Sequence, residues 1–322
     1  RRLMAYKVFV ASRSYSKYSE KTKRFLQEND CELDYNKIDR PYKEVDLFNI
    51  VEDYDAIIVG VDEVTKKVIN KGKKLKVIAK NGVGVDNIDL QAASKNGIYV
   101  INAPGTNSPS VSDLAVALML ALGRNIPKVN KMTKNGYWKR EIGFELWEKT
   151  VGIIGTGDIG KGVAKRLFGF NCKLLAYDIN EDKNFSNMYN IEYKKLDNLL
   201  KQSDYITLHL PLNNETKNLI DMRELELMAN HSYLINTARG GIINEEALFQ
   251  ALNNSIIAGA ASDVFEKEPP GKNKLLNLDN FIATSHIGAF TYGTNERTGI
   301  EIAKNLVRVL QKERPNNIVN RI

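Results

Sequence analysis

The chain has 322 residues, 43% of them hydrophobic and 26% charged. This length predicts about two domains, with cores large enough to need no disulfides. The formal net charge is +7, but the lysines lie among acidic residues, and no basic block with interleaved aromatics occurs. We therefore expect a solvated, lysine-rich surface and no nucleic-acid partner. The alternative is that the positive charge steers an anionic substrate or cofactor.

The cysteine content and the hydropathy of the chain indicate in which cellular compartment we expect the protein. The two cysteines, Cys31 and Cys172, are far apart and belong to no CxxC or His/Cys cluster. This pattern excludes a disulfide framework and a zinc site, so we expect no metal and a reducing compartment. No apolar run approaches the length of a membrane span, and no signal segment opens the chain. We therefore expect a cytoplasmic protein without a membrane partner.

The first third of the chain alternates short apolar runs with amphipathic stretches. The expected strands are 7–11, 56–60, 76–79 and 99–102, and the expected helices are 18–28, 65–71 and 90–95. Thr65 and Asp89 stand where helix N-caps are expected, and Gly72 and Gly97 stand where the helices should stop. This βαβ order predicts a parallel sheet with helices on both faces.

A second βα series follows an apolar stretch at 112–123, which predicts a buried helix too short to span a membrane. Its expected strands are 151–154, 173–177, 205–208, 232–236, 257–261 and 281–284. Six strands with intervening helices are typical of a dinucleotide-binding sheet. The last segment, 295–312, predicts one amphipathic helix.

A glycine-rich turn, GTGDIG at 155–160, joins the first strand of this series to a helix. Tight turns and close helix packing also select glycine, but a helix N-terminus after a strand suits a pyrophosphate. Asp178 ends the next strand, about 20 residues further on, where a carboxylate binds ribose hydroxyls and repels a 2′-phosphate. The turn therefore predicts NAD rather than NADP. Asp158 adds an unexplained negative charge here, acceptable only if its side chain points to solvent.

Three polar residues after later strands are candidates for the chemistry. Arg239 precedes two glycines, and its guanidinium suits a bidentate grip on a carboxylate. Glu268 and His286 follow the next two strands, at the sheet edge where ligands bind in open α/β folds. Each has a simpler explanation as a surface or structural residue. The other histidines, His209 and His231, suit a strand end and a helix end.

The ordered set GTGDIG with Asp178, HLPL, NTARGG, DVFEKEP and SHIGAFT resembles the NAD-dependent D-2-hydroxyacid dehydrogenases. KNGVGVDNIDLQAASKNGIYVINAPG at 80–105 resembles the substrate loop of the same family, close to its phosphoglycerate dehydrogenases. The resemblance covers nearly the whole chain. It implies two doubly wound parallel-sheet domains: a Rossmann nucleotide-binding domain, 103–290, inserted into a smaller flavodoxin-like substrate domain, 1–102 with 291–322.

The resemblance also implies site roles. Arg239 matches the arginine that binds the substrate carboxylate and polarises the reacting carbonyl. His286 matches the residue that acts as acid and base, and Glu268 matches the carboxylate that is paired with that histidine. The implied cofactor is NAD, contacted by Gly155, Gly157, Asp158, Ile159, Gly160, Asp178, His209, Leu210, Pro211, Thr237, Ala238, Asp263 and Gly288. The implied substrate contacts are Lys80, Val83 and Gly84, with Arg239 and His286. A homodimer is implied, with 109–123 and the stretch to Trp147 contributing.

The chain departs from the family pattern in two places. Ser285 replaces the proline that commonly precedes the catalytic histidine. Asp62 and Glu63 occupy a loop in which phosphoglycerate dehydrogenases tend to carry a basic residue, and Lys80 is an alternative cation. No C-terminal regulatory domain is recognisable. Phosphoglycerate is a leading candidate that this acidic loop weakens, and hydroxypyruvate, glyoxylate and other small 2-keto acids stay open. An alternative class is an NAD-responsive scaffold, as in the related C-terminal-binding co-repressors.

Overall fold

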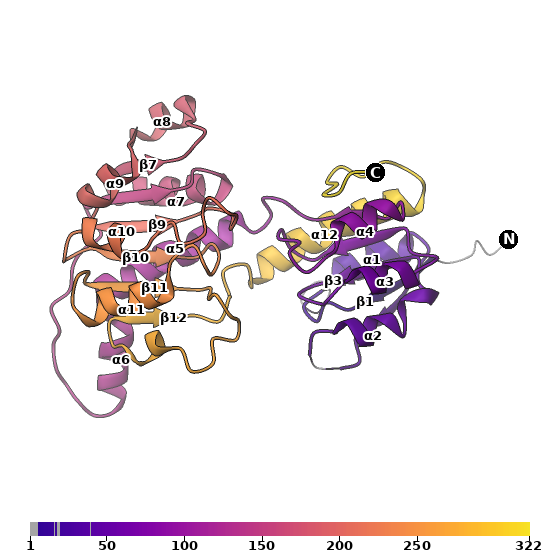
Figure 1. Cartoon of the computed structure of the whole chain (residues 1–322), viewed down its shortest axis with the longest axis horizontal. Helices are drawn as coiled ribbons and strands as arrows, with labels where there is room; N and C mark the ends of the chain where they lie inside the picture. The colour runs from indigo at the N-terminus through magenta and orange to yellow at the C-terminus, as the bar shows by residue number, and fades with distance from the viewer. Residues whose placement is uncertain (1–5, 16, 18–19, 39) are drawn as a thin grey trace. The chain divides into compact units, whose positions relative to one another are not determined.

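The computed structural model describes residues 6–15, 17, 20–38 and 40–322. The chain forms two compact α/β units (Figure 1). Unit 1 comprises Arg1–Asn107 and Ala289–Ile322, and unit 2 comprises Ser108–Gly288. The boundaries expected from sequence, after 102 and after 290, therefore differ by a few residues from those of the compact units. The fold class itself, two parallel-sheet α/β domains, is confirmed.

Unit 1 has a five-stranded parallel sheet in the order β2-β1-β3-β4-β5. Its strands are β1 (Tyr6–Val10), β2 (Cys31–Tyr35), β3 (Ala56–Val59), β4 (Val77–Lys80) and β5 (Tyr99–Ile101). Its helices are α1 (Glu20–Glu28), α2 (Glu44–Phe48), the 3-10 helix η1 (Val51–Asp53), α3 (Lys66–Lys71), α4 (Leu90–Lys95) and α12 (Tyr292–Leu310). Side chains of α1 and α12 pack on one face of the sheet, and those of α2, α3 and α4 on the other. This strand order is that of flavodoxin-like folds.

Unit 2 has a seven-stranded parallel sheet in the order β12-β11-β10-β9-β6-β7-β8. Its strands are β6 (Thr150–Ile154), β7 (Lys173–Tyr177), β8 (Ile191–Tyr193), β9 (Tyr205–Leu208), β10 (Tyr233–Asn236), β11 (Gly259–Ser262) and β12 (Phe281–Ala283). Its helices are α5 (Ser108–Gly123), α6 (Ile126–Lys134), α7 (Asp158–Phe168), α8 (Lys183–Tyr189), α9 (Leu196–Gln202), α10 (Met222–Leu227), α11 (Glu245–Asn253) and the 3-10 helix η2 (Lys274–Asn277). The order reverses between β6 and β9, where doubly wound folds bind ligands.

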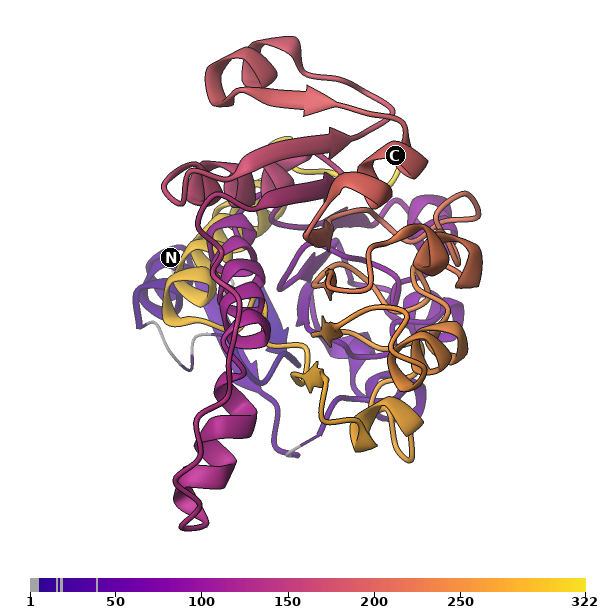
Figure 2. The same cartoon turned by 90° about the vertical axis from the view of Figure 1, so that its left-hand side faces the viewer.

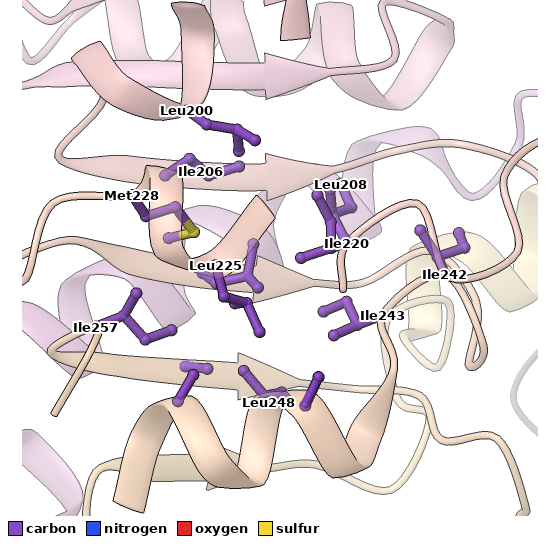
Figure 3. Close-up of a cluster of buried hydrophobic side chains, with 14 of the residues drawn as sticks. Leu200, Ile206, Leu208, Ile220, Leu225, Met228, Ile242, Ile243, Leu248 and Ile257 are labelled. Atoms are coloured by element: carbon purple, nitrogen blue, oxygen red, sulfur yellow. The ribbon is translucent and has the colours of Figure 1, made fainter. Parts of the chain in front are cut away.

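Alternating strand residues supply the two cores of unit 2. In β6, Ile153 joins the cluster under α5 and α7, whereas Ile154 joins the cluster under α9, α10 and α11. Figure 3 shows the second cluster, in which Leu248 on α11 points toward the sheet. Burying a leucine of this kind stabilises a fold by about 1.5–3 kcal/mol. Both faces are covered, so most residues of these strands are apolar.

The sequence-based expectations missed the strands β2 and β8, the α-helices α2, α6 and α8, and the 3-10 helices η1 and η2. The nucleotide-binding sheet consequently has seven strands rather than six, because β8 pairs with the edge of β7. The helix expected at 18–28 begins at Glu20, and its Tyr18 lies outside the described residues. The helix expected at 112–123 begins earlier, at Ser108.

The expected helix ends agree well with the structure. Thr65 and Asp89 are the N-caps of α3 and α4, and the Asp89 carboxylate accepts a hydrogen bond from the Ala92 N–H at 2.8 Å. Gly72 is the C-cap of α3, and Gly97 follows α4 with a φ of +66°. Among the described residues, none of the helices combines the length and the apolar character that crossing a membrane requires.

Candidate functional site

The glycine turn follows β6 at the reversal point of the sheet, and each glycine meets a different constraint. Gly155 has a φ of +94°, and a Cβ there would lie 2.5 Å from the His209 carbonyl oxygen. A Cβ on Gly160 would lie 2.0 Å from the Gly155 carbonyl oxygen. By contrast, a Cβ on Gly157 would meet nothing within 4 Å. Two glycines therefore close the turn, and the third leaves open space at the N-terminus of α7, where a phosphate can approach the backbone.

Asp178 lies beside this turn, just after β7. Its carboxylate accepts hydrogen bonds from the Thr156 N–H at 2.6 Å and the Asn180 N–H at 2.8 Å. Partial burial alone would raise the pKa of Asp178, but the backbone donors at Asn180 and Thr156 outweigh it, so the pKa lies below its usual value. Asp178 also lines a cavity of about 620 Å³ together with Gly157 and Lys161. An ionised carboxylate therefore lines a cavity next to the open glycine.

The structure gives Asp158 a physical role. The side chain is exposed, as its position in the turn requires, and it occupies the first turn of α7. A negative charge there interacts favourably with the helix dipole by about 0.3–1 kcal/mol. Lys161, one turn further on, forms an ion pair with Asp182 at 2.6 Å, and Asp182 raises the pKa of Lys161. Sequence reasoning missed this ion pair, which places a cation one turn after Asp158.

Two buried polar atoms lie at the ends of the adjacent strands β9 and β10. In the described part of the chain, His209 Nδ1 and Thr237 Oγ1 have no hydrogen-bond partner. His209 Nε2 lies 3.0 Å from Thr207 Oγ1, and burial lowers the pKa of His209 to about 3. Leaving such groups unsatisfied costs about 1–3 kcal/mol each. Together with the open space at Gly157, they fit a polar cofactor along this edge of the sheet.

Arg239 is held by the turn that follows β10. The buried Asn236 side chain accepts from the Ala238 N–H at 3.0 Å and donates to the Arg239 carbonyl oxygen at 2.9 Å. A Cβ on Gly240 would lie 2.0 Å from the Phe265 carbonyl oxygen, so this turn is tightly packed rather than flexible. Arg239 itself is half-buried and donates to the Ala238 carbonyl oxygen at 2.7 Å. The positioning role of Asn236 was not predicted, although it lies within the NTARGG sequence.

His286 and Glu268 form a hydrogen-bonded pair at the ends of β12 and β11. His286 Nδ1 lies 2.7 Å from Glu268 Oε2, and both side chains are partly exposed. Because an ionised carboxylate only accepts hydrogen bonds, Nδ1 carries the proton and Nε2 is left to exchange one. Glu268 Oε1 also accepts from the Phe265 N–H at 3.2 Å. His231, by contrast, pairs with Asp204 at 3.1 Å.

Asp263 organises the segment that carries His286. Its buried carboxylate accepts from Thr284 Oγ1 at 2.6 Å and from the N–H groups of Ile287 and Gly288 at 2.8 Å each. Its backbone carbonyl accepts from the His286 N–H at 2.9 Å. These bonds hold His286 at a φ of +55°, a left-handed conformation that costs about 1 kcal/mol or more for a residue other than glycine. Thr284 is a further contact that the sequence did not single out.

Four further cofactor candidates lie near strand or helix ends. Leu210 and Pro211 lie two and three residues after β9, Ala238 lies two residues after β10, and Ile159 lies in the first turn of α7. Leu210 is half-buried, Pro211 exposed and Ala238 buried. Their contact with a cofactor stays a prediction, as it does for Gly288.

The substrate candidates of unit 1 lie at the end of β4 and in the loop that follows it. Lys80 is buried, and its ammonium donates to the Gly60 carbonyl oxygen at 2.5 Å and to Asn87 Oδ1 at 2.8 Å. Val83 and Gly84 lie in the loop after β4, where Asn102 Nδ2 donates to the Val83 carbonyl oxygen at 2.7 Å. The Lys80 ammonium therefore has a structural function in unit 1, and its contact with substrate stays a prediction.

Asp62 has a role that the sequence did not reveal. It is almost fully buried, and its carboxylate accepts from the N–H groups of Tyr42 at 2.8 Å and Gly60 at 2.7 Å. Glu63 is exposed and accepts from the Glu44 N–H at 3.2 Å. The acidic residues of this loop therefore serve its backbone structure.

Unit 2 as a whole defines a class of protein. A doubly wound sheet with a glycine turn at its reversal point, a strand-end carboxylate and a His–Glu pair describes a dinucleotide-dependent oxidoreductase. The model of the family "D-isomer specific 2-hydroxyacid dehydrogenase, NAD binding domain" matches residues 116–288. The chain belongs to this family of NAD-dependent oxidoreductases that act on 2-hydroxy acids.

Individual relatives differ in length and substrate. The chain is 43% identical to a D-3-phosphoglycerate dehydrogenase of Methanocaldococcus jannaschii over 85% of this chain but only 53% of that protein. It is 42% identical to a hydroxypyruvate reductase of Thermotoga maritima over 82% of this chain and 88% of the reductase. The crystal structure of an Aquifex aeolicus D-lactate dehydrogenase with NAD and lactic acid matches with a TM-score of 0.81 and 30% identity, covering 95% and 96% of the two chains. The chain thus spans about half the length of the phosphoglycerate dehydrogenase and most of the length of the reductase and of the lactate dehydrogenase.

Proposed function

We propose that the chain catalyses the reversible oxidation of a small D-2-hydroxy acid to the 2-keto acid, with NAD as the hydride carrier. The observation that carries the proposal is the hydrogen bond between His286 Nδ1 and Glu268 Oε2, 2.7 Å long. Glu268 follows β11, and this strand lies between β12, which precedes His286, and β10, which precedes Arg239. This arrangement leaves Nε2 of the imidazole as the proton-exchanging atom.

Each of these side chains has one chemical task. The Arg239 guanidinium binds the substrate carboxylate and polarises the reacting carbonyl. In the oxidation direction, His286 Nε2 takes the hydroxyl proton, and Glu268 stabilises the imidazolium that forms. In reduction, the same nitrogen returns the proton to the substrate oxygen. When bound, NAD supplies the nicotinamide ring that exchanges the hydride with the substrate carbon.

The remaining assignments follow the family resemblance. We propose the backbone of Val83 and Gly84 as further contacts for the substrate carboxylate, with Lys80 beside them. The leading substrate candidates are 3-phosphoglycerate in the oxidation direction and the 2-keto acid hydroxypyruvate in the reduction direction, because relatives named for each resemble this chain with similar identity. Glyoxylate is a further alternative. The buried Asp62 leaves no basic side chain at its own position to hold a phosphate.

We also propose that the chain acts as a homodimer through the segment between α5 and β6. α6 has no buried residue, and it extends away from the rest of unit 2 in Figure 2. After it, Tyr137, Trp138 and Ile142 are 67%, 89% and 96% exposed. Both ends of the segment are anchored, since the Phe144 N–H donates to the Gly123 carbonyl oxygen at 2.6 Å and Leu146 is buried. A large apolar surface of this kind marks an interaction site.

The proposed location is the cytoplasm, on the basis of the two thiols. Cys31 and Cys172 are both free. Burial raises the pKa of Cys31 to about 12 and that of Cys172 to about 11. Such thiols are poor nucleophiles near neutral pH, and an enzyme with unpaired cysteines suits a reducing compartment.

A panel of 2-keto acids assayed with NADH and with NADPH tests the proposed reaction. We expect turnover of at least one acid with NADH, and a loss of about 10²–10⁴-fold in kcat for His286→Ala, with NADH binding retained. His231→Ala is the matched control, because this exposed histidine pairs with Asp204 just before β10 and β9, at the opposite ends of these strands from the candidate site. Equal turnover by His286→Ala would contradict the acid/base assignment. Tight NADH binding with no active acid would support the co-repressor-like scaffold.

A further inference from the structure

Three uncharged polar side chains meet at the carboxyl edge of the unit 1 sheet. Asn81, the residue directly after β4, donates through Nδ2 to Ser12 Oγ at 2.9 Å and to Ser14 Oγ at 3.1 Å. Both serines follow β1. We propose that this group, the Ser12–Ser14–Asn81 cluster, binds a free hydroxyl on the carbon next to the reacting carbon of the substrate. The chain then prefers hydroxypyruvate and D-glycerate to acids without that hydroxyl, an inference that rests on the proposed function.

The cluster lies where a sheet of this strand order binds ligands. In the order β2-β1-β3-β4-β5, the winding of the chain reverses between β1 and β3, and flavodoxin-like folds bind ligands outside the carboxyl ends of the strands at this point. The Ser12 N–H donates to the Ile58 carbonyl oxygen at 3.1 Å, and the Asn81 N–H donates to the Val59 carbonyl oxygen at 2.8 Å. Two members of the cluster are therefore fixed on the end of β3, one from each side.

The hydrogen-bonding capacity of the cluster suits a hydroxyl group. A side-chain amide has two N–H donors, and Asn81 uses both on the serines, so its Oδ1 is left as an acceptor without a partner among the described residues. Each serine oxygen accepts one of these bonds and keeps its own O–H, and the two oxygens are 3.5 Å apart. A hydroxyl can donate to Asn81 Oδ1 and accept from a serine at once. An ionised phosphate ester only accepts, and a methyl group does neither.

Partial burial makes this selection stricter. Ser12 is only 5% exposed, and a Cβ on Gly60 would lie 3.3 Å from Ser12 Oγ, so the serine fills the space over the end of β3. Ser14 and Asn81 are half-buried and can be reached from outside. A ligand that covers the cluster without a hydroxyl leaves these polar groups unpaired and away from water. Unpaired polar groups of this kind reject a ligand more strongly than a small difference in apolar fit does.

The cluster adjoins the proposed substrate loop. The Gly82 N–H donates to the Lys80 carbonyl oxygen at 2.8 Å, so the chain makes a γ-turn centred on Asn81. Val83 follows two residues after Asn81, and two residues of chain span at most about 7 Å. A three-carbon acid whose carboxylate contacts the Val83 backbone therefore has its distal hydroxyl within reach of the Asn81 side chain.

The ratio of kcat/KM for hydroxypyruvate to that for pyruvate, measured with NADH, tests the proposal, because the two acids differ only in this hydroxyl. We expect a ratio of about a hundredfold in the wild type and a fall of about tenfold in Asn81→Ala. Ser14→Ala, which leaves Asn81 one serine partner, should lower the ratio about threefold. A merely structural effect of either substitution would lower both kcat/KM values equally and leave the ratio unchanged.

Asn29→Ala is the matched control. It removes a half-buried amide that donates to the Phe25 carbonyl oxygen at 2.8 Å just before β2, at the amino edge of the same sheet. Its ratio should equal that of the wild type. The proposal would be overturned by equal ratios in the wild type and both cluster variants, or by a wild type that prefers pyruvate or hydroxypyruvate 3-phosphate to hydroxypyruvate.

Titration calorimetry separates failure of the cluster from failure of the proposed function. In the presence of NADH, which prevents oxidation of the added acid, D-glycerate should bind to the wild-type chain about tenfold more tightly than D-lactate. This preference should disappear in Asn81→Ala and persist in Asn29→Ala. Equal affinities in the wild type would refute hydroxyl recognition even in a chain that reduces 2-keto acids. A chain that shows the preference but reduces no 2-keto acid would contradict only the proposed function.

Discussion

Three buried or partly buried carboxylates, those of Asp62, Asp178 and Asp263, each accept at least two hydrogen bonds from nearby backbone. Hydrogen bonds to a charged group contribute about 1.5–3 kcal/mol each. These residues fix the loops that carry the proposed site, and Asp178 in addition lines the cavity beside Gly157. Spacing singled out Asp178 and the family resemblance Asp263, but neither predicted their hydrogen bonds with threonine side chains. The role of Asp62 depends on Tyr42, 20 residues away, a contact that no local pattern predicts.

His209 makes the stability of the chain depend on pH. Burial lowers the pKa of His209 to about 3 in the folded state, whereas its pKa in the unfolded state is about 6.5. The unfolded state therefore holds the extra proton between these values, and folding stability falls as the pH drops through this window, by at most about 1.4 kcal/mol per pH unit. Between pH 6.5 and 5 we expect wild type to lose about 1–2 kcal/mol more than His209→Gln, measured by urea unfolding without cofactor. His231→Gln is the control, and parallel pH profiles for wild type and His209→Gln would refute the prediction.

Asp178 should set the preference for NADH over NADPH. Its ionised carboxylate repels the 2′-phosphate, so Asp178→Asn should lower the ratio of kcat/KM for NADH to that for NADPH by about tenfold or more, or about 1.4 kcal/mol. Glu226→Gln removes the same charge from an exposed position on α10 and should leave the ratio unchanged. A ratio that stays constant in Asp178→Asn would mean that another group excludes the phosphate.

At the scale of elements, the buried strands, the capped helices and the edge strands β5 and β12 were predictable, whereas the edge strands β2 and β8 were not. β7 and β9 match their expected bounds because they are apolar runs covered on both faces. β2 and β8 were not predicted, because an edge strand needs few apolar residues. β2, for example, contains Glu32 and Asp34, and only its Cys31 is buried. The sequence did not predict α6 either, because none of its residues is buried. Helix periodicity becomes visible in sequence only when a core imposes it.

In the turn between β6 and α7, substitution of Gly157 should affect NADH affinity, whereas substitution of Gly160 should affect folding stability. Gly157 has a φ of −69° and open space where a Cβ would lie, so Gly157→Ala should change the free energy of unfolding by only about 1 kcal/mol. The added methyl group occupies the approach to the helix N-terminus, and NADH affinity should fall about tenfold or more. Gly160→Ala is the contrasting variant, because its Cβ would overlap the Gly155 carbonyl and should lower the melting temperature. Unchanged NADH affinity in Gly157→Ala, measured by fluorescence titration, would place the pyrophosphate elsewhere.

At the scale of the whole molecule, the ends of each unit fit an insertion of one domain into the other. In unit 2, the exit residue Gly288 lies beside the entry helix α5, since a Cβ on it would be 3.4 Å from Val111. In unit 1, Thr106 Oγ1 lies 2.7 Å from Thr298 Oγ1, and Arg297 Nε donates to the Thr106 carbonyl oxygen at 3.1 Å. Chain ends that lie close together are what domain insertion requires. The late position of the glycine turn in the sequence follows from this topology.

The exposed segment after α6 should control assembly of the chain. Trp138 is 89% exposed within one chain, and an aromatic side chain of this size buries about 150–250 Å² when an interface covers it. Trp138→Glu places a charge there and should raise the dimer dissociation constant by at least two orders of magnitude, or about 3 kcal/mol. Met188→Glu is the matched control, because Met188 is 70% exposed on α8, outside the segment. Sedimentation velocity at micromolar concentration should find Trp138→Glu monomeric and both wild type and Met188→Glu dimeric. A monomeric wild type, or a Trp138→Glu variant that stays dimeric with unchanged circular dichroism, would exclude this segment as the dimer contact.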